Sequence, residues 1–246
     1  ILNIVRQQQG DYMSSKRKQK KLKNIIEIAD YYPKKIVHNT PKTENQKEYY
    51  NLIQSNHTDI ILGVGPSGTG KTLLAVESAI RGYQDKRFDK IVITRPAVSI
   101  DEQHGFLPGN LNQKMEPWVT PIIDVFQNHF YKHEVEKMVA QGDIEIAPLA
   151  YMRGRTFKDA FIIGDEMQNA TSSQFKMLLT RIGDRSKMVI TGDLAQADRE
   201  HKNGLLDFIR LMRDGASHRI CLQEFDRSDV QRHPVVKEVL RLYRDY

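Results

Sequence analysis

A glycine-rich segment carries the first residues whose types and spacing could do chemistry. GPSGTGKT at 65–72 matches the pattern G-x-x-x-x-G-K-[ST]. In this pattern glycines let backbone N–H groups curl around phosphates, the lysine reaches the β- and γ-phosphates, and the threonine binds Mg²⁺. The segment predicts a nucleoside triphosphate site. Its expected binding residues are Gly65, Pro66, Ser67, Gly68, Thr69, Gly70, Lys71 and Thr72.

Two adjacent acids follow the apolar start of FIIGDEMQN at 161–169. An acid at the end of a buried strand suits a Mg²⁺ anchor, often through water, and the next acid suits a base for an attacking water. Alone, such a pair could be two solvated acids. In a chain with a phosphate-binding segment, it predicts Asp165 and Thr72 as metal ligands and Glu166 as the base.

A third segment, VITGDLAQ at 189–196, ends a further apolar run with Thr191, Gly192 and Asp193. Gln196 follows one turn later. A polar residue at the tip of a neighbouring strand can sense the γ-phosphate. Taken alone, this segment would indicate only a strand followed by a Gly-Asp turn.

The elements that must position these residues alternate along the chain. Apolar runs predict strands at 59–65, 89–96, 160–166 and 187–193, with further extended segments at 144–152 and 219–225. Helical spacing predicts helices at 71–83, 171–182, about 203–213 and about 234–245, and one or two helices within 119–140. Thr43 and Gln46 form a capping-box pattern that predicts another helix to about residue 56. The punctuated stretch 101–118 is expected to be a loop.

Strands without polar alternation indicate a parallel sheet whose two faces are both covered by helices. The predicted fold class is therefore α/β.

Composition excludes several classes of protein. The chain has 246 residues, of which 39% are hydrophobic and 28% charged, and no apolar run approaches the roughly 18 residues of a membrane-spanning helix. Its one cysteine, Cys221, excludes an internal disulfide and a cysteine-based zinc site, and is expected to be a buried strand residue. The eight histidines show no ligand spacing. We expect a cytoplasmic protein without a membrane partner.

The net charge of +6 comes from one end of the chain. Residues 1–23 carry seven Lys or Arg and one acid, whereas residues 24–246 balance. We expect residues 1–24 to form a basic, weakly ordered arm and residues 25–246 to form one domain. The arm could bind nucleic-acid phosphates or another anionic surface, or it could be solvated without a specific partner.

The three segments together resemble motifs I, II and III of superfamily 1 helicases, in which the second motif is DExQ and the third is GDxxQ. Gln46 lies about twenty residues before the glycine-rich segment, at the place of the glutamine that recognises adenine in those ATPases. TRPAV at 94–98 resembles their motif Ia, beside the nucleic-acid track. The resemblance implies that Gln168 and Asp193 couple the γ-phosphate state to the nucleic-acid side.

A closer resemblance is to the PhoH-like family of P-loop ATPases, and it covers about residues 41–246. It implies a RecA-like P-loop NTPase core that hydrolyses ATP with Mg²⁺. The chain departs from the usual family pattern at Gly164, where an apolar residue is usual, and at Met167, where Ala is common. The matching segments are PKTENQ, GPSGTGKT, TRPAV, GFLPGNLNQKM at 105–115, IEIAPLAYMRGRTF at 144–157, IIGDEMQNATSSQFKMLLTRIG at 162–183, TGDLAQAD at 191–198 and DVQRHPVV at 229–236.

Efficient hydrolysis usually needs an arginine at the γ-phosphate, worth about 10³–10⁵ in rate in GTPases. A single-domain ATPase often receives it from a neighbouring subunit, so we expect a homo-oligomeric ring; the family resemblance points to a hexamer. Arg232 is the first candidate. Arg153 and Arg155 are the alternatives and could instead hold RNA or an interface. Each could also be a surface salt bridge.

These observations lead to one expected function and one alternative. We expect ATP hydrolysis coupled to binding or remodelling of RNA or another single-stranded nucleic acid. The alternative is a nucleotide-dependent oligomeric switch that acts on protein partners without nucleic acid. A small-molecule kinase fits less well, because such kinases usually lack the Asp-Glu pair. The expected catalytic residues are Lys71, Asp165, Glu166, Gln168, Asp193 and Arg232.

Overall fold

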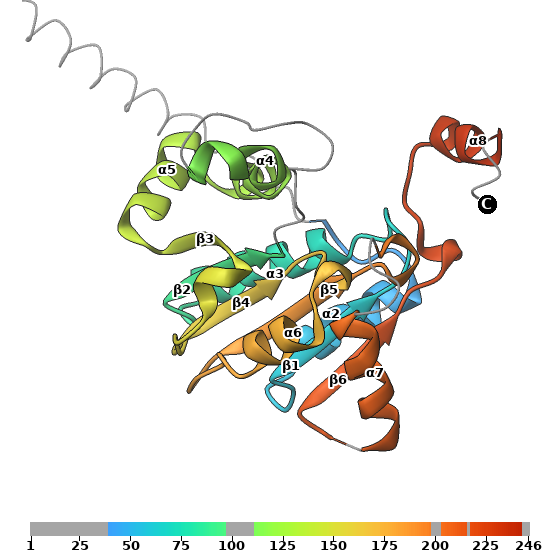
Figure 1. Ribbon diagram of the computed structural model, residues 1–246. Coiled ribbons are helices and arrows are strands. Elements are labelled where there is room, and N and C mark those ends of the chain that lie inside the picture. Colours follow the sequence, from blue (N-terminus) through green and yellow to red (C-terminus); the bar gives the residue numbers. More distant parts are fainter. Residues whose placement is uncertain (1–38, 97–110, 198–202, 216, 243–246) are drawn as a thin grey trace, which may run out of the picture. The chain divides into compact units, whose positions relative to one another are not determined.

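The predicted motifs lie on one sheet of six parallel strands (Figure 1). The computed structural model describes residues 39–96, 111–197, 203–215 and 217–242. The expected arm at 1–24 and the boundary at residue 25 lie outside this part of the chain and remain predictions. The strands are β1 (Ile60–Val64), β2 (Lys90–Arg95), β3 (Ile144–Pro148), β4 (Ala160–Gly164), β5 (Lys187–Gly192) and β6 (Ile220–Glu224).

The order of the strands brings the three predicted motifs together. The sheet runs β3-β2-β4-β5-β1-β6, so β5 lies between the strand before the P-loop and the strand before the acid pair. In register, Ile61 pairs with Val189, and Val189 pairs with Ile163. Because the strands are parallel, their carboxyl ends meet at one edge of the sheet, where residues 65–72, 165–166 and 191–193 follow.

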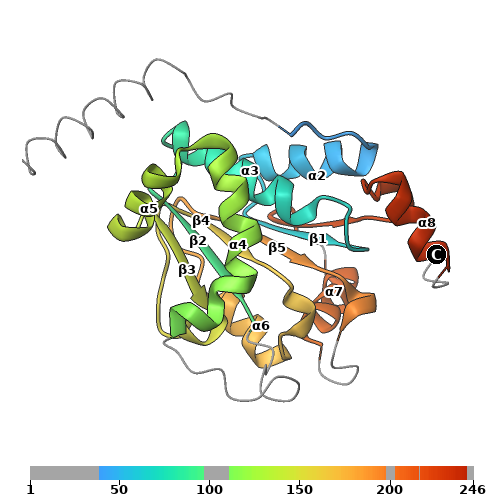
Figure 2. The same cartoon turned by 90° about the horizontal axis from the view of Figure 1, so that it is seen from above.

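Helices cover both faces of the sheet, as Figure 2 shows. One face packs against four helices, and the other against two helices and two short 3₁₀ turns, η2 (Leu149–Met152) and η3 (Met167–Asn169). The longer helices are α2 (Glu44–Gln54), α3 (Lys71–Gln84), α4 (Leu111–His129), α5 (Lys132–Gln141), α6 (Ser172–Leu179), α7 (Gly204–Asp214) and α8 (Pro234–Leu242). The first four cover one face, and α6 and α7 the other.

Alternating side chains of β1 supply two separate hydrophobic cores. Ile61 belongs to the buried cluster that includes Phe126 of α4 on one face, whereas Leu62 belongs to the cluster that includes Phe175 of α6 on the other. All five residues of β1 are buried. A strand buried on both faces has no polar alternation, which explains why the apolar runs predicted the parallel sheet correctly.

Local capping signals set two helix starts. Thr43 caps α2, and its hydroxyl accepts from the backbone N–H of Gln46 at 3.2 Å, which confirms the predicted capping box. Thr171 and Gln174 form a second box at the start of α6. In both helices the threonine side chain accepts a hydrogen bond from a backbone N–H that has no partner within the helix.

Three sequence-based expectations were wrong in part. Residues 111–118 belong to α4 and not to a loop; the remainder of the expected loop, up to residue 110, lies outside the described residues. Helix-favouring residues and the packing of Ile122 and Phe126 outweigh the backbone hydrogen bonds that the helix prolines remove. The extended segment at 144–152 ends at Pro148 and continues as η2. Cys221 lies on a strand as expected, but it is only half-buried because β6 is an edge strand.

The last helix, α8, lies apart from the sheet in both views (Figures 1 and 2). Its exposed hydrophobic residues include Val235, Val239 and Leu242. No helix among the described residues is long and apolar enough to span a bilayer.

Candidate active site

The P-loop begins the site. Gly65, Gly68 and Gly70 have φ angles of 149°, 85° and 85°, a region that glycine occupies without steric cost. These angles let the chain turn sharply between β1 and α3. The side chain of Lys71 folds over the turn, and its Nζ donates to the carbonyl oxygens of Gly65 and Pro66, both at 2.7 Å.

Lys71 lies among carboxylates at the same edge of the sheet. Burial lowers the pKa of its ammonium group, and the negative charges of Asp193, Glu166 and Asp165 oppose that shift. A cation held by loop carbonyls beside a turn of backbone N–H groups is suited to binding phosphate.

Asp165 follows β4 and is held by two hydroxyl groups. Its Oδ1 accepts from Oγ1 of Thr72 at 2.7 Å and from Oγ1 of Thr191 at 2.6 Å. The residue is only 5% exposed. This cluster consists of oxygen donors, the ligand type that Mg²⁺ prefers. The chemistry of these residues therefore fits the predicted metal site at Thr72 and Asp165.

Glu166 has an unusual backbone conformation and two side-chain partners. Its φ is 52°, in the left-handed region, which costs a non-glycine residue roughly 1–2 kcal/mol. Its Oε2 accepts from Nε2 of Gln168 at 2.6 Å, and its Oε1 lies 3.4 Å from Nη2 of Arg95 at the end of β2. Local strain of this kind is found at functional sites, where the surrounding contacts maintain it.

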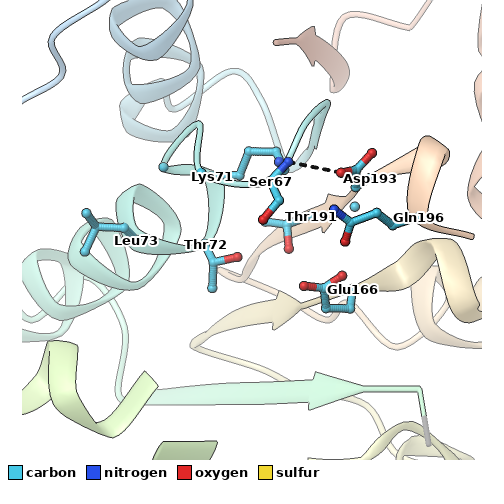
Figure 3. Close-up of a pocket in the computed structure, with 11 residues that line it drawn as sticks. Ser67, Lys71, Thr72, Leu73, Glu166, Thr191, Asp193 and Gln196 are labelled. Carbon is cyan, nitrogen blue, oxygen red and sulfur yellow. Dashed lines mark hydrogen bonds between the residues drawn. The ribbon is translucent and has the colours of Figure 1, made fainter. Parts of the chain in front are cut away.

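A chain of hydrogen bonds connects Glu166 to the P-loop. Gln168, which is 1% exposed, also accepts from the backbone N–H of Asp193 at 3.1 Å. Oδ2 of Asp193 accepts from the backbone N–H of Ser67 at 3.0 Å, the dashed line in Figure 3. The three motifs predicted from the sequence are therefore joined by direct contacts.

A cavity of about 220 Å³ lies between these segments. Its lining includes Lys71, Thr72, Glu166 and Gln196, whose side chains are labelled in Figure 3. The other residues that line it are Ser67, Gly68, Gly70, Leu73, Thr191, Gly192 and Asp193.

Gln46 lies against the P-loop but does not line this cavity. Its Nε2 donates to the carbonyl oxygen of Thr69 at 2.9 Å, and its Oε1 accepts from the backbone N–H of Lys42 at 2.7 Å. The side chain is 4% exposed. In this arrangement Gln46 connects the start of α2 to the P-loop, and its recognition of adenine stays a prediction.

Arg232 lies on the P-loop of its own chain. Its Nη2 donates to Oγ of Ser67 at 2.9 Å. From the sequence we expected Arg232 to serve a neighbouring subunit, and this position gives that expectation no support. Sequence could not reveal the contact because Ser67 and Arg232 are 165 positions apart.

The two alternative arginines differ from each other. Arg155 pairs with both carboxylate oxygens of Glu145, one at 2.7 Å, and its guanidinium carbon lies 4.6 Å from the ring centre of Phe157. These contacts occupy it within its own chain. Arg153 is exposed, two positions after the exposed Tyr151.

Two residues of the site have contacts that the sequence alone does not predict. Thr191 donates to Asp165, and Arg95 pairs with Glu166. Their position at the carboxyl ends of strands was the available signal. Their contacts depend on the strand order.

The profile of the PhoH-like protein family matches residues 38–244. The chain belongs to the PhoH-like family. This membership and the six-stranded parallel sheet with a P-loop after β1 confirm the predicted α/β P-loop NTPase fold.

Similar relatives come from several bacteria. A PhoH-like protein of Bacillus subtilis is 44% identical over 206 residues, which cover 82% of this chain and 63% of the relative. A PhoH-like protein of Mycobacterium tuberculosis is 44% identical over 84% of this chain and 58% of its own length. Protein PhoH of Escherichia coli is 34% identical over 82% of this chain and 57% of its own length. The chain thus spans about three fifths of these curated relatives.

Among solved structures, Pif1 helicase from Candida albicans is 15% identical, with a TM-score of 0.37 over 76% of this chain and 40% of the helicase. The Sulfolobus solfataricus SWI2/SNF2 ATPase core in complex with dsDNA is 12% identical, with a TM-score of 0.40 over 65% of this chain and 34% of that protein. Both scores lie below 0.5, so neither likeness supports a functional conclusion.

Proposed function

We propose that this protein hydrolyses ATP with Mg²⁺ and couples hydrolysis to the binding of RNA or another single-stranded nucleic acid. The observation that carries the hydrolytic part is the hydrogen-bonded chain Glu166–Gln168–Asp193–Ser67. It connects the expected base to the loop that would hold the phosphates. A P-loop without such a connection would support nucleotide binding alone.

Different residues at the sheet edge bind the phosphates and the metal ion. Lys71 and the backbone N–H groups of the P-loop bind the phosphates, and Thr72 and Asp165 hold the metal ion. When bound, Mg²⁺ neutralises charge on the phosphate oxygens. Thr191 orients Asp165 through the bond at 2.6 Å. ATP is the expected nucleotide because Gln46 occupies the position of the adenine-recognising glutamine.

Glu166 orients the attacking water and accepts its proton. It lines the cavity opposite the P-loop, and its two oxygens have separate partners in Gln168 and Arg95. Gln168 also contacts Asp193, so a change at the γ-phosphate reaches Glu166 through one buried side chain.

The nucleic-acid part rests on motif resemblance and on the position of Arg95. TRPAV resembles a helicase motif beside the nucleic-acid track, and its Arg95 contacts Glu166 directly. Tyr151 and Arg153, exposed after the neighbouring strand β3, supply an aromatic ring and a cation of the kind that single-stranded nucleic acids bind. Because Arg95 contacts Glu166, a nucleic-acid phosphate group near Arg95 would influence this proposed general base.

A homo-oligomeric ring remains our expectation from the family resemblance. Because Arg232 contacts its own P-loop, this arrangement does not support a ring in which a neighbour supplies that arginine. Light scattering coupled to gel filtration, with and without an ATP analogue, measures the number of subunits.

The deciding experiment is steady-state ATP hydrolysis by the wild-type protein and the Glu166→Gln variant. Each is assayed with and without single-stranded RNA and DNA, across protein concentrations. We expect hydrolysis that nucleic acid stimulates and that the variant loses, with ATP binding retained.

Other outcomes would change the proposal. Hydrolysis that is lost in Glu166→Gln but is indifferent to RNA and DNA would favour the oligomeric switch that acts on proteins. ATP binding without hydrolysis under any condition would refute the enzymatic proposal and leave a nucleotide-sensing module.

A further inference from the structure

The segment that follows β6, residues 225–232, runs beside the P-loop. The backbone N–H of Phe225 donates to the carbonyl oxygen of Val64 at 2.7 Å, and a Cβ on Gly65 would lie 2.4 Å from the carbonyl oxygen of Phe225. Further along, the backbone N–H of Gln231 donates to the carbonyl oxygen of Gly68 at 2.9 Å. The segment therefore contacts both the beginning and the middle of the loop.

A buried carboxylate anchors this segment to the start of α2. Asp229 is 1% exposed, and its Oδ2 accepts from Nδ2 of Asn45 at 2.8 Å and from the backbone N–H of Asp226 at 2.9 Å. Burial alone would raise the pKa of Asp229, but hydrogen bonds from Thr43, Asn45 and the Asp226 amide outweigh it and keep the pKa below its usual range. The backbone that carries Arg232 is thus fixed three residues away.

The side chain of Arg232 lies across the middle of the loop. Its Nη2 donates to Oγ of Ser67, and a Cβ on Gly68 would lie 2.5 Å from its Nε. Arg232 does not itself line the cavity, but it contacts two residues that do. Because Ser67 also donates to Asp193, Arg232 lies at the far end of the chain that begins at Glu166.

We propose that Arg232 binds the terminal phosphate of the ATP held by its own chain. This inference rests on the proposed ATP site and extends it, because it assigns the arginine to the same subunit. A guanidinium prefers a charged phosphate oxygen to the hydroxyl of Ser67, and its planar fork can donate two parallel hydrogen bonds. In this position the guanidinium stabilises the negative charge that develops on the transferred phosphoryl group.

Binding measurements test whether Arg232 contacts the terminal phosphate. Isothermal titration compares Mg²⁺–AMP-PNP with Mg²⁺–ADP for the wild type, Arg232→Ala and Arg232→Lys, with Arg227→Ala as the control. Arg227 is exposed on the same segment. We expect Arg232→Ala to weaken AMP-PNP binding about tenfold or more while ADP binding changes about twofold or less. Circular dichroism establishes that each variant is folded, and the Lys variant is used if the Ala variant is not.

Three binding results would overturn the inference. They are equal losses for both nucleotides, unchanged affinity for AMP-PNP, and tighter binding by Arg232→Ala, which would indicate that the arginine obstructs the site. These measurements need no hydrolysis. They therefore decide the inference even if the wild-type protein proves inactive and the proposed ATPase function fails.

A complementation experiment separates action within one chain from action between chains. Arg232→Ala and Lys71→Ala are co-expressed with different tags and purified through both tags, and ATP hydrolysis is compared with that of each variant alone. If Arg232 serves its own chain, the mixed preparation is as inactive as the single variants, or no mixed assembly forms. Restored hydrolysis would overturn the inference, because Arg232 of the Lys71→Ala chain would then serve the intact P-loop of its neighbour.

Discussion

Arg95 at the end of β2 forms an ion pair with Glu166, which follows β4, with Nη2 and Oε1 3.4 Å apart. Both side chains are partly shielded, at 28% and 34% exposure, and the carboxylate is the one expected to activate water. The pair therefore connects the segment that resembles a nucleic-acid-binding motif with the predicted base.

Replacement of Arg95 tests whether this pair positions the base. We predict that Arg95→Ala lowers kcat for ATP about tenfold and changes KM less, because Glu166 loses one of its two side-chain partners. Arg95→Lys should retain part of the rate. Steady-state kinetics measure both parameters, and Arg210→Ala, on the exposed side of α7, is the control. A higher KM at unchanged kcat would contradict a positioning role.

The two departures from the usual family pattern, Gly164 and Met167, lie next to each other in the core. Gly164 has no side chain, and a Cβ there would lie 2.8 Å from Cδ1 of Ile190, 2.9 Å from Cδ2 of Leu178 and 3.2 Å from Cγ of Met167. Met167 is completely buried at this point. The side chain of Met167 thus lies next to the space that a side chain at position 164 would enter.

A double-mutant cycle tests whether the two positions compensate for each other. We predict that Gly164→Val lowers the free energy of unfolding by about 1–3 kcal/mol through overpacking, and that Met167→Ala lowers it by about 2–5 kcal/mol through a cavity. The double variant should lose less than the sum, since the valine fills the space that the methionine leaves. Urea denaturation measures each value. Strict additivity would mean that the two positions do not share a space.

The hydroxyl of Thr191 should control the affinity for metal. It donates to Oδ1 of Asp165 at 2.6 Å, so its removal leaves the carboxylate free to turn. We predict that Thr191→Ala raises the Mg²⁺ concentration for half-maximal hydrolysis about tenfold, whereas Thr191→Ser, which keeps the hydroxyl, stays near the wild type. Titration with Mg²⁺ at saturating ATP checks this. Equal behaviour of the Ser and Ala variants would argue against the hydrogen bond as the cause.

Lys187, at the opposite end of β5, should make the stability of the protein depend on pH. Its Nζ donates to the carbonyl oxygens of Ile53, at 2.7 Å, and Ser55, and burial lowers its pKa from the ordinary 10.5 to about 8. Between these pH values the unfolded chain binds more protons at this residue than the folded chain. The Lys187 contribution to the free energy of unfolding therefore rises with pH across this range.

Comparison with Lys187→Met isolates this contribution. We predict that from pH 8 to pH 10 the free energy of unfolding of the wild type increases relative to that of the variant. Urea denaturation at several pH values measures the difference. A difference that is constant or falls with pH would show that the lysine is not held with a lowered pKa.

Local sequence was sufficient for most of the elements and for the types of residue in the site. The unbroken apolar run of β1 predicts burial on both faces, and the capping box at Thr43 marks a helix start through bonds within four residues. The P-loop is equally local, since glycine conformation and the spacing to Lys71 determine its turn. For such features the physical cause lies within one short segment.

The partners of the site residues depend on the three-dimensional arrangement. The order β4-β5-β1 brings Thr191 to Asp165, and the neighbouring position of β2 brings Arg95 to Glu166. Arg232 reaches its own P-loop because β6 pairs beside β1 and the chain then returns along the loop. Strand order and register result from packing across the whole sheet, so no single segment of the sequence contains them.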